Sequence, residues 1–479
     1  MIDVHASAIT HLNHLIRGDY SAAELLTAHF AQIDRHDPSV RALVWQDRES
    51  AVKAAATVKG RPDGQRPLLG LSMTVKESFN VSGAPTTWGI PAFRNNIASA
   101  DAVTVQRLRA AGAIVFGKSN VPENLADWQS YNSIYGQTNN PWNLNRSPGG
   151  SSGGSGASLA AGYSALELGS DIGGSIRNPA HFNGVFGHKP TWGLIPSRGQ
   201  NLPPAIAEPD IAVVGPLARS AFDLELMLDV LAAPDLLDKG LRYELKGLPY
   251  RNLGQLRVGV WANDPVCPVS RETESRVLKV ADALAQAGAY VNHDARPEFT
   301  SQHNHDVYTT LLFSFLAVSF PDEEYNAMKA AAAQIPEGAN DPASRMPKIA
   351  TLNHRDWLRY NNMRDYLRWA WHRFFEQYDI LLAPQNPTPA FPHDHGPPEQ
   401  RTVTVDGNPQ DYMQQIFWAG LIGISRLPST VIPTGAGEEG LPIGVQIVGN
   451  AFDDRLTIQV AQELERQGFR FAVPPGFAN

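Results

Sequence analysis

Strand–helix–strand units constrain the fold of this chain more than any other feature of its sequence. In the first unit, the apolar run Leu68–Val75 predicts a strand. Asp101 can cap a helix that runs to Ala111 and stops at a glycine, and Ile114–Phe116 predicts the next strand. A strand, a helix and a second strand in this order are typical of α/β folds.

A second unit of the same kind lies in the middle of the chain. Leu256–Trp261 predicts a strand, and the helix after it ends at Gly288. That helix carries apolar residues at helical spacing, namely Val277, Val280, Ala281 and Leu284. The repetition of this order predicts a layered α/β architecture.

The other segments predict helices at the N-terminus and a less regular region later. Ser21 and Glu24 have the form of a capping box before a helix. Residues 301–415 are rich in Trp, Tyr, Phe and Pro, and Thr402–Val405 predicts one arm of a hairpin. Because no repeat or linker interrupts the chain, we expect one domain over 1–479 that begins with helices in 1–66.

Composition and charge exclude several classes of protein. The net charge of −8 and the sequence pI near 6.0 do not favour nucleic acid or an anionic membrane as a partner. The longest apolar runs, Leu311–Val318 and Ile416–Ile424, fall far short of the roughly 20 residues of a membrane span. The start of the chain lacks the pattern of a signal peptide, and Cys267 is the single cysteine. We therefore expect a cytoplasmic protein without a membrane span.

Two clusters of glycine and serine carry the strongest functional signal. They are SPGGSSGGSG (Ser147–Gly156) and LGSDIGGSIRNPA (Leu168–Ala180). Glycines allow several backbone N–H groups to converge beside a serine, which is how an oxyanion hole is built. A single cluster of this kind is more often a tight turn, but two clusters that both carry serines favour a catalytic serine.

A catalytic serine needs a base, and neither cluster contains a histidine. His181 and His188 come after the second serine motif. Lys76 follows an apolar strand, where burial can remove the charge of an amine and make it a base. A lysine at a strand end is more often a salt-bridged surface residue, so the pattern alone leaves both interpretations open.

At these positions the sequence resembles the amidase signature hydrolases. The resemblance is strongest over Leu69–Gly199. It returns in YDILLAPQNPTPA (Tyr378–Ala390) and in LPSTVIPTG…GLPIGVQIVG (Leu427–Gly449). The segment Asn120–Gly156 resembles the fatty-acid amide hydrolase branch in particular.

The resemblance implies a fold and its parts. It implies one large α/β/α domain with a twisted, mixed central sheet covered by helices. The catalytic core is expected in residues 67–200, and a variable region that forms the substrate pocket is expected in residues 301–415.

Residue by residue, the resemblance also implies a catalytic triad without histidine. Lys76 matches the base, Ser151 matches a bridging serine that the family holds with a cis peptide bond, and Ser175 matches the nucleophile. The implied oxyanion hole comprises the backbone amides of Ile172, Gly173, Gly174 and Ser175. The backbone carbonyl of Leu125 is expected to face the substrate amide, and Ser152 is expected to hydrogen-bond Lys76.

Residues around this triad are expected to be structural. We interpret Asp171 and Arg177, which flank the nucleophile, as a buried ion pair that shapes the loop. Glu77, Asn183 and Pro122–Glu123 depart from the usual pattern of the family without removing a catalytic group. These departures weaken any transfer of substrate identity.

The implied function is hydrolysis of small-molecule amides that have an apolar or aromatic part, with no cofactor and no metal. Carbamate (urethane) and ester substrates are alternatives, because the same acyl-enzyme chemistry serves all three. A second alternative is the glutamine-hydrolysing, A-type chain of an amidotransferase, and a third is a non-catalytic binding protein. The third conflicts with the retention of Lys76, Ser151 and Ser175 together. We expect a monomer or a homodimer.

Weaker motifs in the chain have simpler explanations. Gly149–Gly153 also fits the nucleophile elbow of α/β-hydrolases, but the residues before it are polar and typical of turns. The pairs His303/His305 and His393/His395 are more simply loop histidines than metal ligands. The basic, aromatic segment His354–Tyr378 favours an amphipathic helix over a nucleic-acid site. Its aromatic residues are candidates for a pocket wall, as are Trp128, Tyr131 and Trp192.

Overall fold

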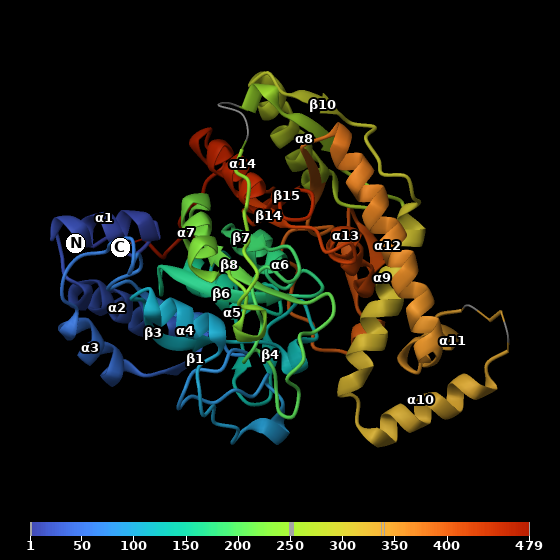
Figure 1. The fold of residues 1–479 in the computed structure, drawn as a ribbon, viewed down its shortest axis with the longest axis horizontal. Helices are drawn as coiled ribbons and strands as arrows, with labels where there is room; N and C mark the ends of the chain where they lie inside the picture. Colours follow the sequence, from blue (N-terminus) through green and yellow to red (C-terminus); the bar gives the residue numbers. More distant parts are fainter. Residues whose placement is uncertain (1, 249–252, 337, 340, 479) are drawn as a thin grey trace.

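A mixed β-sheet of 11 strands organises the protein (Figure 1). The computed structural model describes residues 2–248, 253–336, 338–339 and 341–478. In spatial order the strands are β1 (Leu43–Gln46), β3 (Ile114–Ser119), β2 (Ser72–Lys76), β6 (Leu166–Asp171), β8 (Val213–Ala218), β7 (Phe186–Lys189), β14 (Ser429–Ala436), β15 (Pro442–Val448), β11 (Ile380–Pro384), β9 (Arg257–Val260) and β10 (Tyr290–Asn292). Strands β3, β2 and β6 are parallel, as are β11, β9 and β10, whereas the strands from β6 to β11 pair antiparallel. The expected mixed sheet is confirmed.

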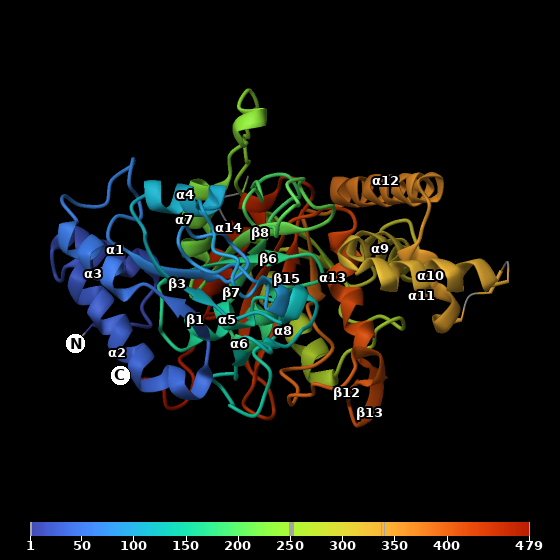
Figure 2. The ribbon, with the colours of Figure 1, turned by 90° about the horizontal axis from the view of Figure 1, so that it is seen from below.

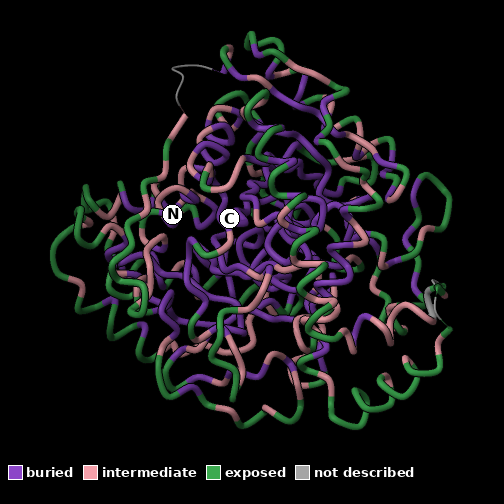
Figure 3. Tube along the Cα trace, turned by 45° about the vertical axis from the view of Figure 1, so that its right-hand side comes forward, coloured by how far each residue is buried: buried purple, intermediate pink, exposed green. Residues whose placement is uncertain are grey.

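Helices cover both faces of this sheet. In chain order they are α1 (Ala8–Arg17), α2 (Ala22–Val40), α3 (Arg48–Thr57), α4 (Val103–Ala110), α5 (Gly153–Ala160), α6 (Arg177–Asn183), α7 (Ala221–Leu231), α8 (Arg271–Gln286), α9 (Ser301–Leu316), α10 (Asp322–Gln334), α11 (Pro342–Ala350), α12 (His354–Gln377), α13 (Ile416–Gly423) and α14 (Asp454–Arg466). Figure 2 shows α4, α7 and α14 on one side of the strands and α5, α6 and α8 on the other. Strands β2, β3, β6 and β8 are buried along their whole length, so the core lies between these layers (Figure 3). The expected α/β/α layering is confirmed.

The region 301–415 is more regular than its composition suggested. It contains the helices α9 to α12, which lie together at one end of the sheet (Figures 1 and 2). The expected hairpin is present as β12 (Thr402–Val405) and β13 (Asn408–Asp411). The amphipathic helix predicted over His354–Tyr378 is α12, which buries Trp371, Phe374 and Phe375. None of the helices in the described part of the chain is long and apolar enough to cross a membrane.

Local signals at element ends were partly correct. Ser21 and Glu24 form the predicted capping box at the start of α2. The first strand is shorter than predicted, because β2 begins at Ser72. The prediction that Asp101 caps the next helix is wrong: α4 begins after Ala102, and the Asp101 carboxylate instead accepts a hydrogen bond from Ser82 N at 2.8 Å.

The N-terminal segment also contains a strand that was not predicted. Strand β1 pairs antiparallel with β3 at the edge of the sheet. Its four residues, LVWQ, are all partly buried, so they lack the alternation of apolar and polar residues that reveals a strand in a sequence. A short β4–β5 hairpin (Tyr131–Asn132 and Gly136–Gln137) was likewise not predicted.

The parallel strands bring two predicted site residues to the same place. Strands β2 and β6 are neighbours and run in the same direction. Lys76 is the last residue of β2 and Asp171 is the last residue of β6. Active sites of open α/β sheets lie outside the carboxyl ends of their strands, so this edge is the candidate site.

Buried histidines near the N-terminus make the fold sensitive to acid. Burial lowers the pKa of His11 to about 3 and that of His5 to about 4, with Arg219 acting in the same direction. The unfolded chain takes up these protons near pH 6.5. The stability that depends on neutral histidine is therefore complete above that pH, and it is lost as the pH falls towards the folded pKa values.

We predict that His11→Gln removes part of this acid sensitivity. As the pH falls from about 6 to about 4, the free energy of unfolding of the variant relative to the wild type should rise by roughly 1.4 kcal/mol for each pH unit. Urea unfolding of both proteins at several pH values measures this difference. Buried carboxyl groups such as Asp223 change the stability with pH in the opposite direction, but they contribute equally to both proteins and cancel in the difference. The same substitution at the exposed His303 is the control. A difference that does not vary with pH would contradict the prediction.

Candidate active site

Lys76 is buried beside two serine hydroxyls. Its Nζ lies 2.6 Å from Ser151 Oγ and 3.0 Å from Ser170 Oγ, and its side chain is 0% exposed. Burial lowers the pKa of Lys76 to about 7, although the negative charges of Asp171 and Glu77 act in the opposite direction. Burial therefore favours the uncharged amine, which is the form that can accept a proton.

Ser151 is held by close packing of backbone around the first glycine cluster. The Gly150–Ser151 peptide bond is cis, as the family resemblance implied. Gly150 N donates to Asn178 Oδ1 at 3.0 Å. A side chain at position 150 would collide with the carbonyl of Asp127, so this position needs glycine.

Ser175 lies in a turn that is joined to the first cluster. Ser152 N donates to Ser175 O at 3.1 Å, which fastens the two clusters to each other. The Ser175 side chain is 6% exposed. Its hydroxyl has no hydrogen-bond partner among the described residues. The direct bond between Ser151 and Ser175 that a proton relay needs is not formed in this structure.

Backbone amides before Ser175 are available to a ligand. The N–H groups of Ile172, Gly173 and Ser175 donate to no other described residue. The Gly174 N–H differs from expectation, because it donates to Asp171 Oδ1 at 2.9 Å. The other three amides of the expected set have no such partner among the described residues, and their role as an oxyanion hole stays a prediction.

Two aromatic side chains fix the orientation of this loop from behind. Tyr308 donates its hydroxyl to Ile172 O at 2.9 Å, and Trp128 donates Nε1–H to Gly173 O at 2.9 Å. In a trans peptide the carbonyl and the following N–H point in opposite directions. The bond from Tyr308 therefore fixes the direction of the Gly173 N–H. Tyr308 was not identified from the sequence, because its position in a variable helix carries no local signal.

Asp171 and Arg177 form a buried ion pair below the loop. Arg177 Nη2 lies 2.9 Å from Asp171 Oδ1, and both side chains are 0% exposed. Burial alone would raise the pKa of Asp171, but Arg177, Lys189 and the Gly174 amide outweigh it and lower the pKa to about 2. Arg177 also donates to Ala419 O at 3.3 Å, which links the loop to α13.

The partner expected for Ser152 is wrong. Lys76 is hydrogen-bonded by Ser170, while Ser152 Oγ donates to Ser170 O at 3.4 Å. Ser152 is the residue just before α5, and Ser170 is the penultimate residue of β6, so the hydroxyl that contacts the amine comes from the strand end. Leu125 lies in a backbone turn with a φ of 57°. No contact between Leu125 and Ser175 is described, so the role of its carbonyl stays a prediction.

The residues that depart from the family pattern have structural partners. The Glu77 carboxylate accepts hydrogen bonds from Thr87 N at 2.6 Å and Trp88 N at 3.0 Å, and so holds the loop after β2. Asn183 Nδ2 donates to Pro148 O at 2.7 Å, which ties α6 to the first glycine cluster. Pro122 and Glu123 precede the turn at Leu125.

Several alternative sites are not supported in the described ranges. No group of three or more His, Cys, Asp or Glu side chains is placed to hold a metal there. The pair His393/His395 packs ring to ring, and His395 stacks on Tyr131 at 3.8 Å. The residues just before Gly149 form turns and isolated bridges rather than the strand that a nucleophile elbow requires. Of the expected pocket aromatics, Trp192 packs under Arg426 at 4.0 Å.

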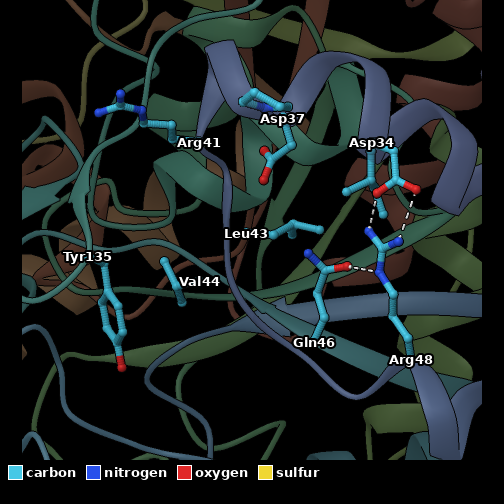
Figure 4. Close-up of a pocket in the computed structure, with 10 residues that line it drawn as sticks. Asp34, Asp37, Arg41, Leu43, Val44, Gln46, Arg48 and Tyr135 are labelled. Atoms are coloured by element: carbon cyan, nitrogen blue, oxygen red, sulfur yellow. Dashed lines mark hydrogen bonds and ion pairs between the residues drawn. The ribbon is translucent and has the colours of Figure 1, made fainter.

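A surface hollow lies elsewhere, between α2 and β1 (Figure 4). Asp34, Asp37, Gln46, Arg48 and Tyr135 are among the residues that line it, and Lys76 and the serines are not. Arg48 Nη2 lies 2.6 Å from Asp34 Oδ1, so these two charges of the hollow already satisfy each other. It is not part of the candidate active site.

The comparisons with known proteins agree on one family. The family model Amidase matches residues 24–458. The chain is 32% identical to the A subunit of glutamyl-tRNA(Gln) amidotransferase from Roseiflexus sp. (strain RS-1), with 94% of each chain covered. It is 31% identical to human fatty-acid amide hydrolase 2, with 92% of this chain and 85% of the relative covered. The solved structure of 6-aminohexanoate cyclic dimer hydrolase with substrate has a TM-score of 0.79 at 28% identity, and all of both chains is covered.

We predict that Arg177→Met destabilises the protein by about 3–5 kcal/mol, because it leaves the Asp171 carboxylate buried without a partner. The control is Arg198→Met, which breaks an ion pair to Asp235 whose arginine is 45% exposed. That change should lower stability by about 1 kcal/mol or less. Denaturant unfolding measures both variants. Equal losses would show that Arg177 does not stabilise a buried charge.

Proposed function

Because the chain belongs to the amidase family, we propose that it hydrolyses amides with Lys76 as base, Ser151 as proton relay and Ser175 as nucleophile. The observation that carries this proposal is the buried amine of Lys76, with a pKa of about 7 and 2.6 Å from Ser151 Oγ. A serine hydroxyl is a weak nucleophile unless a nearby base accepts its proton. Lys118 of the neighbouring strand β3 also contacts a hydroxyl, Thr86 Oγ1 at 3.0 Å, but it is Lys76 that contacts a serine of the first glycine cluster.

The proposed reaction has two halves. Neutral Lys76 accepts the proton of Ser151, Ser151 accepts that of Ser175, and Ser175 Oγ forms a bond to the amide carbon. The oxyanion is bound by the N–H groups of Ile172, Gly173 and Ser175. The relay then returns the proton to the leaving nitrogen, the C–N bond breaks, and an acyl-enzyme remains. Water attacks this ester with the same base and releases the acid.

The substrate is proposed to have an apolar or aromatic part. A cluster of buried apolar residues includes Trp128, Tyr308 and Ile416, and Ile172 of the oxyanion loop packs against it. This side of the loop therefore favours hydrocarbon over charge. Fatty-acid amide hydrolase 2 is named for an amide of this kind, which supports the proposal by analogy.

Carbamates and esters are served by the same groups, because both form an acyl-enzyme with Ser175. Glutamine is the alternative that the similarity to an amidotransferase chain favours. The apolar surroundings of Ile172 weigh against a zwitterionic substrate. Release of ammonia from glutamine, measured beside hydrolysis of anilides, fatty amides and carbamates, distinguishes the two.

We predict that the reactivity of Ser175 follows the charge of Lys76. A fluorophosphonate should form a Ser175–phosphorus bond with loss of fluoride, and the rate should rise with pH to a plateau, half-maximal near pH 7. Ser175→Ala should abolish labelling, and Lys76→Ala should slow it by orders of magnitude. Mass spectrometry of the labelled peptide measures both. Labelling of Lys76→Ala at the wild-type rate would overturn the proposed mechanism.

We predict that Tyr308→Phe lowers kcat about tenfold with little change in KM, since one hydrogen bond to the oxyanion loop is worth roughly 1.4 kcal/mol. The bond orients the Gly173 N–H, which is needed most when the oxyanion forms. Trp128→Phe removes the second donor and is the matched variant. Steady-state kinetics on the best substrate of the screen, with melting temperatures, measures the effect. A rise in KM at unchanged kcat would instead assign Tyr308 to substrate binding.

A further inference from the structure

Gln200 lies outside both glycine–serine clusters, yet one hydroxyl links it to Lys76. Its Nε2 donates to Ser170 Oγ at 3.2 Å and to Ser78 Oγ at 3.2 Å. Ser170 Oγ is in turn 3.0 Å from Lys76 Nζ. Gln200 is 6% exposed and Ser78 is 0% exposed, so the amide and the two serines form a buried network beside the amine.

The backbone around Gln200 holds this side chain in place. Gln200 N donates to Ser197 O at 2.8 Å, which closes a turn. Gly199 O accepts a hydrogen bond from Asn80 N at 2.8 Å. Ser78 and Asn80 belong to the segment that follows Lys76. The turn that carries Gln200 is therefore fastened to the same loop as the lysine.

The arrangement of protons gives Gln200 a specific effect. A neutral lysine has one lone pair and two N–H bonds, and a serine hydroxyl oxygen has two lone pairs. When Gln200 donates to one lone pair of Ser170 Oγ and Lys76 donates to the other, the Ser170 proton has to point away from the amine. The lone pair of Lys76 is then left for Ser151, 2.6 Å away.

Loss of Gln200 would free a lone pair on Ser170. The Ser170 hydroxyl could then rotate and donate its own proton to Lys76. In that state the lone pair of the amine accepts a hydrogen bond from Ser170, which has no part in the proposed proton relay. The lone pair is then not available to accept the proton of Ser151.

We propose that Gln200 is a positioning residue for the general base: its amide fixes Ser170 as an acceptor and thereby aims the lone pair of Lys76 at Ser151. This inference rests on the proposed function, because it requires Lys76 to be the base. The simpler role, in which Gln200 only fastens the turn to the core, affects stability and does not depend on the Ser170 hydroxyl.

A double-mutant cycle with Gln200→Leu and Ser170→Ala separates the two roles. The readout is the plateau rate of fluorophosphonate labelling above about pH 8, with the melting temperature of each variant. Positioning through Ser170 predicts that Gln200→Leu slows labelling about tenfold in the wild type and has almost no further effect in Ser170→Ala. The proposal would be overturned if the two substitutions slowed labelling by independent factors that multiply. It would also be overturned if Gln200→Leu lowered the melting temperature and left the labelling rate unchanged.

Gln200→Glu provides a second test if the leucine variant does not fold. A carboxylate one hydroxyl away from Nζ favours the ammonium form of Lys76. The midpoint of the labelling profile should rise by about one pH unit or more, so that the rate near pH 7 falls at least about fivefold and recovers above about pH 9. Asn201→Asp places the same charge on the next residue, outside the network, and is the control. An equal shift in both variants, or none in either, would overturn the proposal.

The proposed function and the positioning role of Gln200 are contradicted by different results. If Lys76→Ala labels at the wild-type rate, the proposed function itself is wrong. If Lys76 is essential but the Gln200 and Ser170 effects are independent, only the positioning role of Gln200 is wrong.

Discussion

The proposed chemistry at the carboxyl ends of β2 and β6 requires Lys76 to be uncharged, although two carboxylates lie nearby. Burial lowers the pKa of Lys76 to about 7, and Asp171 and Glu77 oppose it. Both carboxylates are already engaged: Asp171 pairs with Arg177, and Glu77 accepts backbone N–H groups of Thr87 and Trp88. These partners therefore offset much of the electrostatic effect that the two carboxylates have on the amine. The structural network around Asp171 and Glu77 is in this sense a condition for any chemistry at Lys76.

Under the proposed function, the elements divide the site into a chemical side and a substrate side. Strands β2 and β6 and the loops just before α5 and α6 supply Lys76 and the serines. Tyr308 of α9 and Ile416 of α13 approach the oxyanion loop from the other side. The two sides meet at Ile172–Gly173. Under the proposed function, substitutions in α9 and α13 other than at Tyr308 are expected to change what is bound while the relay stays as it is.

The sequence predicted those features whose cause is local. The capping box of α2, the hairpin at Thr402–Val405 and the apolar run before Lys76 depend on neighbouring residues. Strand β1 was missed because its residues lie at a half-buried edge, and Asp101 was misassigned because its carboxylate is occupied by Ser82.

Within the site, residue types could be predicted but partners could not. Lysine, glycines and serines were identified by their own motifs. The choice of Ser170 over Ser152 as the neighbour of Lys76 depends on how a strand end meets a helix start. Gln200 and Tyr308 reach the site from segments whose local sequence has no catalytic pattern. Hydrogen bonds between distant segments are set by packing, which a single sequence does not reveal.

The Gly174 amide shows why such packing matters for chemistry. Had it pointed at the substrate, Asp171 would have lost a donor in a buried site, where an unsatisfied carboxylate is costly. Its bond to Asp171 fixes one side of the Gly173–Gly174 peptide, while Trp128 fixes the other. An alkoxide oxygen offers three lone pairs, and under the proposed function the three remaining amides equal that number. The loop would then use one donor for its own rigidity without leaving the proposed oxyanion short of a partner.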